Sequence, residues 1–370
     1  MNRRRAPEAG TWIAFSLLIL LASCSGSELE PGDLLGPPGD PGDRGNDPAA
    51  PTEPDELRQL DCSDLDEVIG LSEQIAANAG VTRGEYPIVL AHGFFGFDRV
   101  GPVEYWNEAD QALRDQGFAA YITAVEPIAS SVDVRGPELA RQIACIARMS
   151  GVDAVNLVGH SQGGLDARVV AADPIFSRFV ASVTTVATPH RGTLIADAAL
   201  GLIPDLAGDV LDSIAGFWAT LAGAPDGGSA DLDAALELLS EAHSPAFNSA
   251  HPDNAAIPYF SWAGRSVGHV LSWDYADEDC AGGVHANPQV RDVVDPELFV
   301  TYELLSWLSG HNDGLVTVNS SRWGTFMGCI PADHADEIGL FQLTLTDPIS
   351  GFNHREFLVD VASELADRGL

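Results

Sequence analysis

Ser161 stands in a setting that favours nucleophilic chemistry. It is the centre of the pentapeptide Gly-His-Ser-Gln-Gly at 159–163, which follows the apolar run Val155–Val158 and precedes a helix-compatible segment at 165–170. A serine on a strained turn between a strand and a helix needs glycine two positions to either side, because side chains there would collide with neighbouring backbone. Its hydroxyl could attack a carbonyl carbon and form a covalent acyl intermediate. The pentapeptide is short enough to arise by chance, so the interpretation depends on the flanking strand and helix.

The run from Tyr86 to Ala91 is a second feature at which chemistry is expected. It has the pattern of a strand that ends in the loop His-Gly-Phe-Phe-Gly at 92–96. In α/β-hydrolases such a loop supplies one backbone N–H to the oxyanion hole, and the residue after the nucleophile supplies the other. Those residues would be Phe94 and Gln162. The alternative is a tight turn with a buried aromatic pair, which the presence of the serine motif disfavours.

A serine nucleophile of this kind needs an acid and a histidine, which follow it along the chain in that order. We expect Asp313 to be the acid, because it lies in a loop between two apolar, strand-like runs. An ordinary Asp-Gly turn would explain the same residues. Of the histidines only His334 and His354 follow Asp313; His334 lies in a polar loop suited to presenting its imidazole, whereas His354 borders the final helix. The predicted triad is therefore Ser161, His334 and Asp313.

The elements that must position these residues alternate between apolar strands and helical patterns, which indicates a mostly parallel sheet with helices on both faces. The expected strands are 87–91, 118–124, 153–158, 180–187 and 257–263, and the expected helices are 103–116 and 137–149. Such a sheet places its active site at the carboxyl ends of its strands, where the serine motif and the 92–96 loop both fall. The predicted fold class is α/β, with the α/β-hydrolase arrangement.

Several motifs together resemble one family, the secreted bacterial triacylglycerol lipases of the Pseudomonas and Burkholderia type. The resemblance runs through residues 86–106, 159–164, 183–193, 312–316 and 333–336, and it covers most of 85–370. It implies the same nucleophile, acid and base. Family members often mature with a dedicated membrane-bound foldase, so the resemblance also names a lipase-specific foldase as a candidate partner.

The resemblance further implies one structural calcium ion, Ca2+, beside the histidine loop. The aspartates carried over are Asp336, two residues after the histidine, and Asp295. Carboxylate oxygen is a suitable hard ligand for calcium, and a bound ion would keep His334 aligned. The chain departs from the family pattern after Asp336, where residues 337–344 are shortened, so the carbonyl ligands stay open. The family's disulfide cysteine soon after the catalytic acid is also missing.

The apolar residues of 193–242 recur at helical spacing on both sides of a glycine-rich break at 223–229. By resemblance this segment is a lid, which would cover the active site in water and move aside at a lipid surface. A helical cap packed permanently on the core fits the same pattern. The rest of 85–370 is the predicted catalytic domain.

The first residues resemble an export signal. Three arginines at 3–5 precede the apolar stretch Trp12–Ala22, which is too short to span a bilayer as a stable helix. Leu-Ala-Ser-Cys at 21–24 resembles a bacterial lipobox, in which Cys24 is lipidated and anchors the protein to a membrane. The alternative is an ordinary signal peptide and a secreted protein. Ser25, which follows the cysteine, favours the outer membrane for a lipoprotein.

We expect a signal peptide at 1–24, a Gly/Pro/Asp-rich tether at 25–56 and a helical strap at 57–84.

Four further cysteines remain in this exported chain, which favours two disulfides. The preferred pairs are Cys280 with Cys329, which would clamp C-terminal loops, and Cys62 with Cys145, which would pin the strap to a helix. Two other pairings exist, and a four-thiolate metal site is disfavoured because no Cys-x-x-Cys pair is present. The formal charge of −35 argues against nucleic acid as a partner, because phosphate binding needs clustered Lys and Arg.

The sequence therefore predicts an exported serine hydrolase that cleaves long-chain acyl esters, with triacylglycerols as the first expected substrate. An esterase, a phospholipase or a polyester depolymerase would use the same triad. A catalytically silent surface protein on the same fold is the alternative from another class, and the intact order of Ser, Asp and His speaks against it.

Overall fold

Six strands form one central sheet in which every neighbouring pair is parallel. They are β1 (Arg83–Ala91), β4 (Phe118–Ile122), β5 (Val155–His160), β6 (Val180–Val186), β7 (Tyr259–Gly264) and β10 (Thr325–Ile330), in the order β10-β7-β6-β5-β1-β4. The strand β5, which ends at the serine motif, lies between β1 and β6 and is buried along its whole length. A parallel strand covered on both faces is expected to be mostly apolar, as Val155–Val158 is; its one polar residue, Asn156, accepts a hydrogen bond from Ser182.

The computed structural model describes residues 53–94, 96, 99–100, 103–126, 129–203, 231–269, 280, 292–340 and 346–370. Within these ranges, Glu53–Leu370 forms one compact unit. The predicted signal peptide with Cys24 and most of the tether lie outside the described residues, as does the middle of the predicted lid. None of the described helices is both long and apolar enough to span a membrane.

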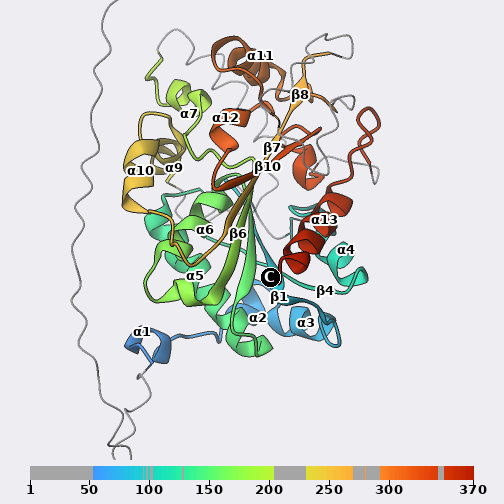
Figure 1. The fold of residues 1–370 in the computed structure, drawn as a ribbon. Coiled ribbons are helices and arrows are strands. Elements are labelled where there is room, and N and C mark those ends of the chain that lie inside the picture. The colour runs from blue at the N-terminus through green and yellow to red at the C-terminus, as the bar shows by residue number, and fades with distance from the viewer. Residues whose placement is uncertain are drawn as a thin grey trace, which may run out of the picture. The chain divides into compact units, whose positions relative to one another are not determined.

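Helices cover both faces of the sheet (Figure 1). Alternate residues of β1 show why: Val89 and Ala91 join the core formed with α5 (Val132–Ser150) and α6 (Gln162–Ala172). Ile88 and Leu90 point to the other face, where α4 (Ala109–Asp115) and α13 (His354–Asp367) contribute the core. The expected α/β-hydrolase layering is therefore confirmed.

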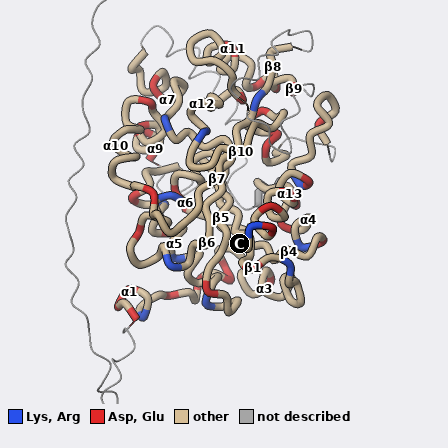
Figure 2. Tube along the Cα trace, viewed as in Figure 1, with Lys and Arg blue, Asp and Glu red and all other residues tan. Residues whose placement is uncertain are grey.

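The remaining elements are short and lie around this core. They are α1 (Asp55–Arg58), α2 (Leu65–Val68), α3 (Leu71–Ala77), β2 (Arg99–Val100), β3 (Val103–Glu104), η1 (Phe176–Phe179), α7 (Leu194–Ala199), α9 (Leu232–Leu239), α10 (Ser244–Ala250), β8 (Ser266–Val267), β9 (Asp292–Val293), α11 (Phe299–Leu308), α12 (Val318–Ser321) and η3 (Asp336–Ile338). Acidic residues outnumber basic ones by 54 to 19, and Figure 2 shows where they fall along the trace.

Three expectations about local structure were wrong. The helix expected at 103–116 begins only at Ala109, because 103–104 forms β3. The runs on either side of Asp313 are not strands: helix α11 precedes it, and residues 314–317 form a bent segment that leads into α12. Strand β10 was not expected. Short apolar runs fit a buried helix and a strand equally well, which explains these errors.

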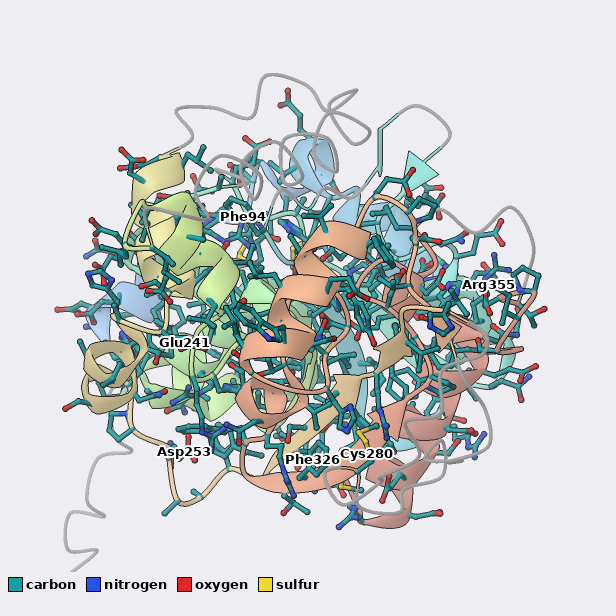
Figure 3. The ribbon with its side chains drawn as sticks, turned by 90° about the horizontal axis from the view of Figure 1, so that it is seen from above. Phe94, Glu241, Asp253, Cys280, Phe326 and Arg355 are labelled. Atoms are coloured by element: carbon teal, nitrogen blue, oxygen red, sulfur yellow. A yellow bond between two sulfur atoms is a disulfide. The ribbon has the colours of Figure 1, made fainter. Side chains whose placement is uncertain are left out.

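Both preferred disulfides are present. Cys62 is bonded to Cys145 of α5, with 5.8 Å between their Cα atoms, and it holds the N-terminal strap on that helix. Cys280 is bonded to Cys329 of β10, with 5.3 Å between the Cα atoms. Figure 3 shows this second bond beside Phe326, with which it forms a small apolar cluster.

Helix α3 of the strap pairs with the free edge of β4 through side-chain amides. Gln74 accepts a hydrogen bond from Ile122 N (2.8 Å) and donates one to Ile122 O (3.1 Å). Asn78, one helical turn later, makes the same pair of bonds with Ala120, at 2.9 and 2.8 Å. Residues four apart on a helix thus match residues two apart on a strand. An edge strand exposes unpaired backbone groups that favour association, and these amides cover them.

We expect Asn78→Leu to lower the free energy of unfolding by about 1–3 kcal/mol, because it leaves the buried N–H of Ala120 without a partner and leaves its C=O with the longer bond from Arg114 (3.4 Å). The measurement is denaturant unfolding with both disulfides intact, and Gln111→Leu is the control because the Gln111 amide bonds only to side chains on the surface of α4. Equal stability of the two variants would contradict the assigned role of the amides.

Candidate active site

Ser161 occupies a strained turn between β5 and α6. Its backbone has φ 55° and ψ −128°, a conformation that L-residues with side chains rarely adopt. A Cβ at Gly159 would lie 2.6 Å from the carbonyl carbon of Gly163, and a Cβ at Gly163 would collide with Ala91 O. Both glycines are therefore required by close backbone approach, as the spacing of the motif predicts. Ser161 N donates to Val186 O at 2.9 Å, which ties the turn to β6.

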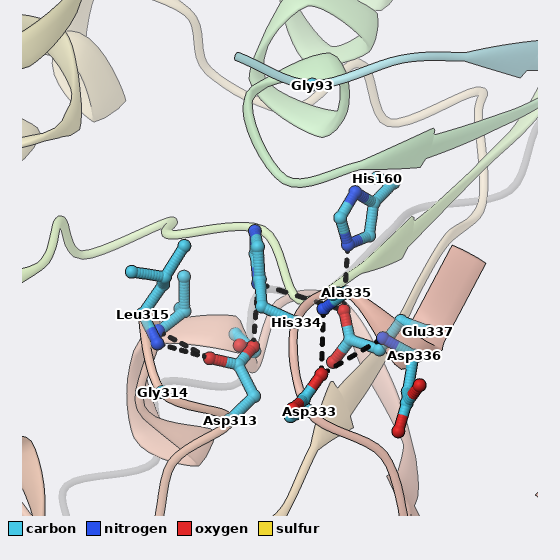
Figure 4. A network of polar contacts seen from close by, with 12 residues as sticks. Gly93, His160, Asp313, Gly314, Leu315, Asp333, His334, Ala335, Asp336 and Glu337 are labelled. Carbon is cyan, nitrogen blue, oxygen red and sulfur yellow. Dashed lines mark hydrogen bonds and ion pairs between the residues drawn. The ribbon is translucent and has the colours of Figure 1, made fainter. Parts of the chain in front are cut away.

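Asp313 and His334 are hydrogen-bonded to each other (Figure 4). His334 Nδ1 lies 2.9 Å from Asp313 Oδ2, and the other carboxylate oxygen accepts from the backbone N–H groups of Leu315 (2.8 Å) and Val316 (2.7 Å). Because both oxygens act as acceptors, Nδ1 is the nitrogen that carries the proton in neutral His334. The other nitrogen, Nε2, then keeps its lone pair and can accept a proton.

Ser161 and His334 line the same cavity. Five polar side chains lie on its wall, and four of them have partners: Tyr105 and His160 are bonded to each other, Thr193 donates to Leu315 O, and His334 is bonded to Asp313. The remaining wall is apolar, formed by Phe94, Pro189, Ile195, Ala196, Leu236, Leu239, Leu315, Val316, Ile338 and Leu340. The cavity can therefore enclose an apolar chain whose reacting end meets Ser161.

Phe94 and Gln162, the residues predicted to form the oxyanion hole, lie on the two segments next to Ser161. A Cβ on Gly93 would lie 2.7 Å from Ser161 Cβ, so the loop that carries Phe94 passes directly against the serine. Gln162 is the first residue of α6, where backbone N–H groups have no partner within the helix. Its side-chain amide donates to Ser130 O at 2.7 Å, which fixes its orientation.

The buried Arg135 holds the loop before Phe94 in place. Its guanidinium donates to Asp166 Oδ2 at 2.8 Å, to His92 O at 3.1 Å and to Val125 O at 3.3 Å. Neither Arg135 nor Asp166 is exposed to solvent by more than 1%. This ion pair connects α5 and α6 to the loop next to the nucleophile. The sequence analysis did not single it out, because the partners are 31 positions apart.

A chain of hydrogen bonds passes behind the histidine and was also missed from the sequence. Tyr105 accepts from Gly93 N (3.0 Å) and is hydrogen-bonded to His160 Nδ1 (2.7 Å), and His160 Nε2 is hydrogen-bonded to Glu337 Oε2 (2.8 Å). That oxygen lies 3.8 Å from His334 Nδ1. Burial, then the nearby Asp313, raises the pKa of Glu337 well above its usual range. Burial, then His334, lowers the pKa of His160.

Two overlapping groups of carboxylates lie beyond His334. Asp295 and Asp336, the residues proposed to bind calcium, come together with Asp333, and Asp336 also meets Asp292 and Asp347. Ligand oxygens within each group lie within 4.8 Å of one another. Asp333 already accepts bonds from three backbone N–H groups, those of Asp295, Ala335 and Asp336. Asp333 therefore fixes the conformation of the loop after His334 and also contributes negative charge to the group.

Asp292 is the most unusual of these carboxylates. Its Oδ2 accepts from Ser266 Oγ at 2.5 Å, and its Oδ1 is buried with no hydrogen-bond partner among the described residues. Burial, together with the nearby Asp336, raises the pKa of Asp292 to about 8. Neither Asp292 nor Asp347 was expected at this site. Their sequence positions indicate a metal site only weakly, because an acidic chain contains many aspartates.

Comparison with known proteins agrees with this geometry. The α/β hydrolase fold family matches residues 86–278. A triacylglycerol lipase of Vibrio cholerae is 30% identical over 306 residues, which cover 76% of this chain and 89% of the relative. The chain is an ester hydrolase of the α/β-hydrolase family. A triacylglycerol lipase of Pseudomonas fragi is 32% identical to the hydrolase, over 68% of this chain and 87% of its own. The crystal structure of Staphylococcus hyicus lipase is similar to the hydrolase in fold, with a TM-score of 0.56 and 19% identity over 78% of this chain and 97% of its own.

Replacing Arg135 by Gln in the hydrolase should lower the free energy of unfolding by about 3–5 kcal/mol, because Asp166 would keep a buried charge without its partner. The exposed pair Arg368–Glu364 provides the control, since Arg368→Gln should cost less than about 1 kcal/mol. The double variant Arg135→Met, Asp166→Leu should recover most of the stability. Equal losses for Arg135→Gln and Arg368→Gln in denaturant unfolding would contradict the role of the buried pair.

Proposed function

We propose that the hydrolase is a serine lipase that cleaves long-chain acyl esters, with triacylglycerols as its first substrates. The observation that carries the proposal is the apolar cavity with Ser161 and His334 on its wall and Asp313 bonded to His334. Triacylglycerol lipases among the relatives support this substrate class.

The reaction follows from the arrangement of these groups. His334 Nε2 accepts the proton of the Ser161 hydroxyl while Ser161 Oγ attacks the ester carbonyl carbon. The backbone N–H groups of Phe94 and Gln162 donate to the oxyanion that forms. The intermediate collapses, the leaving alcohol takes the proton from His334, and Ser161 is acylated. Water then attacks the acyl carbon, again giving its proton to His334, and the fatty acid leaves with Ser161 restored.

The Ser161→Ala variant should lose activity by a factor on the order of 10⁵ on every ester, because the nucleophile is gone. Wild type should hydrolyse an emulsion of long-chain triacylglycerol faster than a soluble short-chain ester, since the cavity wall is apolar. Ser309→Ala, at an exposed serine, is the matched control and should keep full activity.

The same assay separates the alternatives. Activity on short-chain esters alone would identify an esterase, and a preference for phosphatidylcholine or polyester film would identify a phospholipase or a depolymerase. A folded protein with no activity on any ester would contradict the proposal and favour a binding protein.

We further propose that Asp292, Asp336 and Asp347 bind one calcium ion, with Asp295 and Asp333 beside it. Oxygen ligands suit calcium, and the buried Oδ1 of Asp292 has no hydrogen-bond partner in the described structure. When bound, the ion supplies positive charge that balances these carboxylates. The residues themselves join three segments: β9, the loop from Asp333 to Glu337 that follows His334, and the turn at Asp347, whose carboxylate accepts from Ile349 N and Ser350 N.

In EDTA the melting temperature should rise as the pH falls from 8 towards 5. The pKa of Asp292 is about 8 in the folded protein and about 4 in the unfolded chain, so protonation favours the folded state and this contribution is lost as the pH rises through 8. Excess calcium should raise the melting temperature most at pH 8. Asp292→Asn should weaken both effects, whereas Asp233→Asn, at an exposed position on α9, should change neither. A melting temperature indifferent to calcium would contradict the site.

We also propose that the protein is exported and anchored through lipidated Cys24, as an outer-membrane lipoprotein. The motif at 21–24 and the two disulfides support export. Cys24→Ala should abolish incorporation of labelled fatty acid in the producing cells. Continued labelling of that variant would contradict the anchor and leave a secreted protein.

A further inference from the structure

Helix α11 presents an apolar face to solvent. Four of its ten residues are large apolar side chains that are at least 43% exposed, namely Phe299, Val300, Trp307 and Leu308. Trp307 is the most exposed of these, at 81%. At 100° per residue, Phe299, Glu303 and Trp307 form one ridge, and Val300, Leu304 and Leu308 form the adjacent ridge, in which Leu304 is partly buried and packs towards Leu305. The exposed apolar residues therefore share one side of the helix.

The opposite side of α11 supports the wall of the substrate cavity. Leu305 is fully buried and packs in one cluster with Ile195 and Leu315. Both of those residues line the cavity that contains Ser161. Figure 1 shows α11 near α7, beyond the carboxyl ends of the strands. Ser161 directly follows β5, at the same end of the sheet. One face of α11 thus belongs to the site, and the other face looks outward from it.

The low charge and the exposed indole of the outer face of α11 indicate what kind of surface it binds. Glu303 is the one charged residue of α11, and in Figure 2 most of the helix is uncoloured by charge. A chain with a net charge of −35 repels an anionic surface and also a second copy of itself. An exposed indole among aliphatic side chains is suited to a boundary between water and acyl chains, where its ring is buried and its N–H stays hydrated.

We propose that the outer face of α11, centred on Trp307, docks onto an uncharged lipid–water interface. The proposal rests on the proposed function and names how its substrate is presented. Docking through α11 holds the wall of the cavity against the lipid, so an ester passes from the lipid phase to Ser161 along an apolar path. The lipid surface then contributes to binding before any ester bond is broken.

The test measures binding apart from catalysis and apart from the anchor. The full chain with Cys24→Ser and Ser161→Ala is mixed with phosphatidylcholine vesicles, and the bound fraction is determined by flotation. Trp307→Ser in this background should lower the partition coefficient by about tenfold, because binding scales with the apolar area buried. Met149→Ser is the matched control, because Met149 is also an exposed apolar side chain, at 44%. It lies at the end of α5 that leads into the start of β5, so it is near the amino ends of the strands, whereas the site is at their carboxyl ends. It should bind as the parent does.

Activity provides the second readout, with Ser161 intact. Trp307→Ser should leave hydrolysis of a soluble short-chain ester unchanged and lower the rate on emulsified triacylglycerol. Mixing anionic phosphatidylglycerol into the vesicles should weaken binding, and salt should relieve that effect.

Equal vesicle binding by the Trp307→Ser and Met149→Ser variants would overturn the proposal. Binding that requires phosphatidylglycerol would also overturn it, as would a change in oligomeric state on Trp307→Ser without a change in vesicle binding. Failure of the proposed function gives a different result from failure of the docking proposal. The protein with Ser161 intact would then hydrolyse no ester, while vesicle binding would still depend on Trp307.

Discussion

The strained backbone at Ser161 is the constraint on which the rest of the site depends. A positive φ at a serine persists only where the surroundings hold it, and here β5 is bonded on both sides while α6 begins at the next residue. Gly159 and Gly163 allow the two elements to approach, and Gly93 allows the neighbouring loop to reach the serine. The turn lifts the hydroxyl out of the sheet and into the cavity. The sheet therefore acts as the rigid support of a single reactive side chain.

Around this turn, buried hydrogen-bonded pairs connect separate segments of the chain. Arg135 and Asp166 connect the helices on one side of the sheet to the loop before Phe94. His160 and Glu337 connect the strand that precedes Ser161 to the loop that follows His334. The carboxylates around Asp292 lie next along the same loop, so their charge bears directly on the segment that carries the catalytic histidine. Stability and the alignment of His334 are consequently linked.

The sequence predicted the parts of the site that depend on local geometry. The glycine spacing around Ser161, the loop before Phe94 and the order of Asp313 and His334 each follow from constraints within a few residues. Five of the six strands could be recognised because they are apolar and parallel. Strand β10 and helix α11 could not, because short apolar runs do not distinguish a strand from a buried helix. Glu337, Arg135 and Asp292 were missed because their roles arise from partners distant in the chain, which no spacing rule connects.

The central claim, that Ser161 is the nucleophile of an apolar site, is tested most directly by covalent labelling. The protein is treated with a long-chain alkyl phosphonate ester, and the modified peptide is identified by mass spectrometry. We expect one adduct, on Ser161, formed much more slowly in His334→Ala and more slowly with a short-chain phosphonate. A label on another residue, or no label on folded protein, would contradict it.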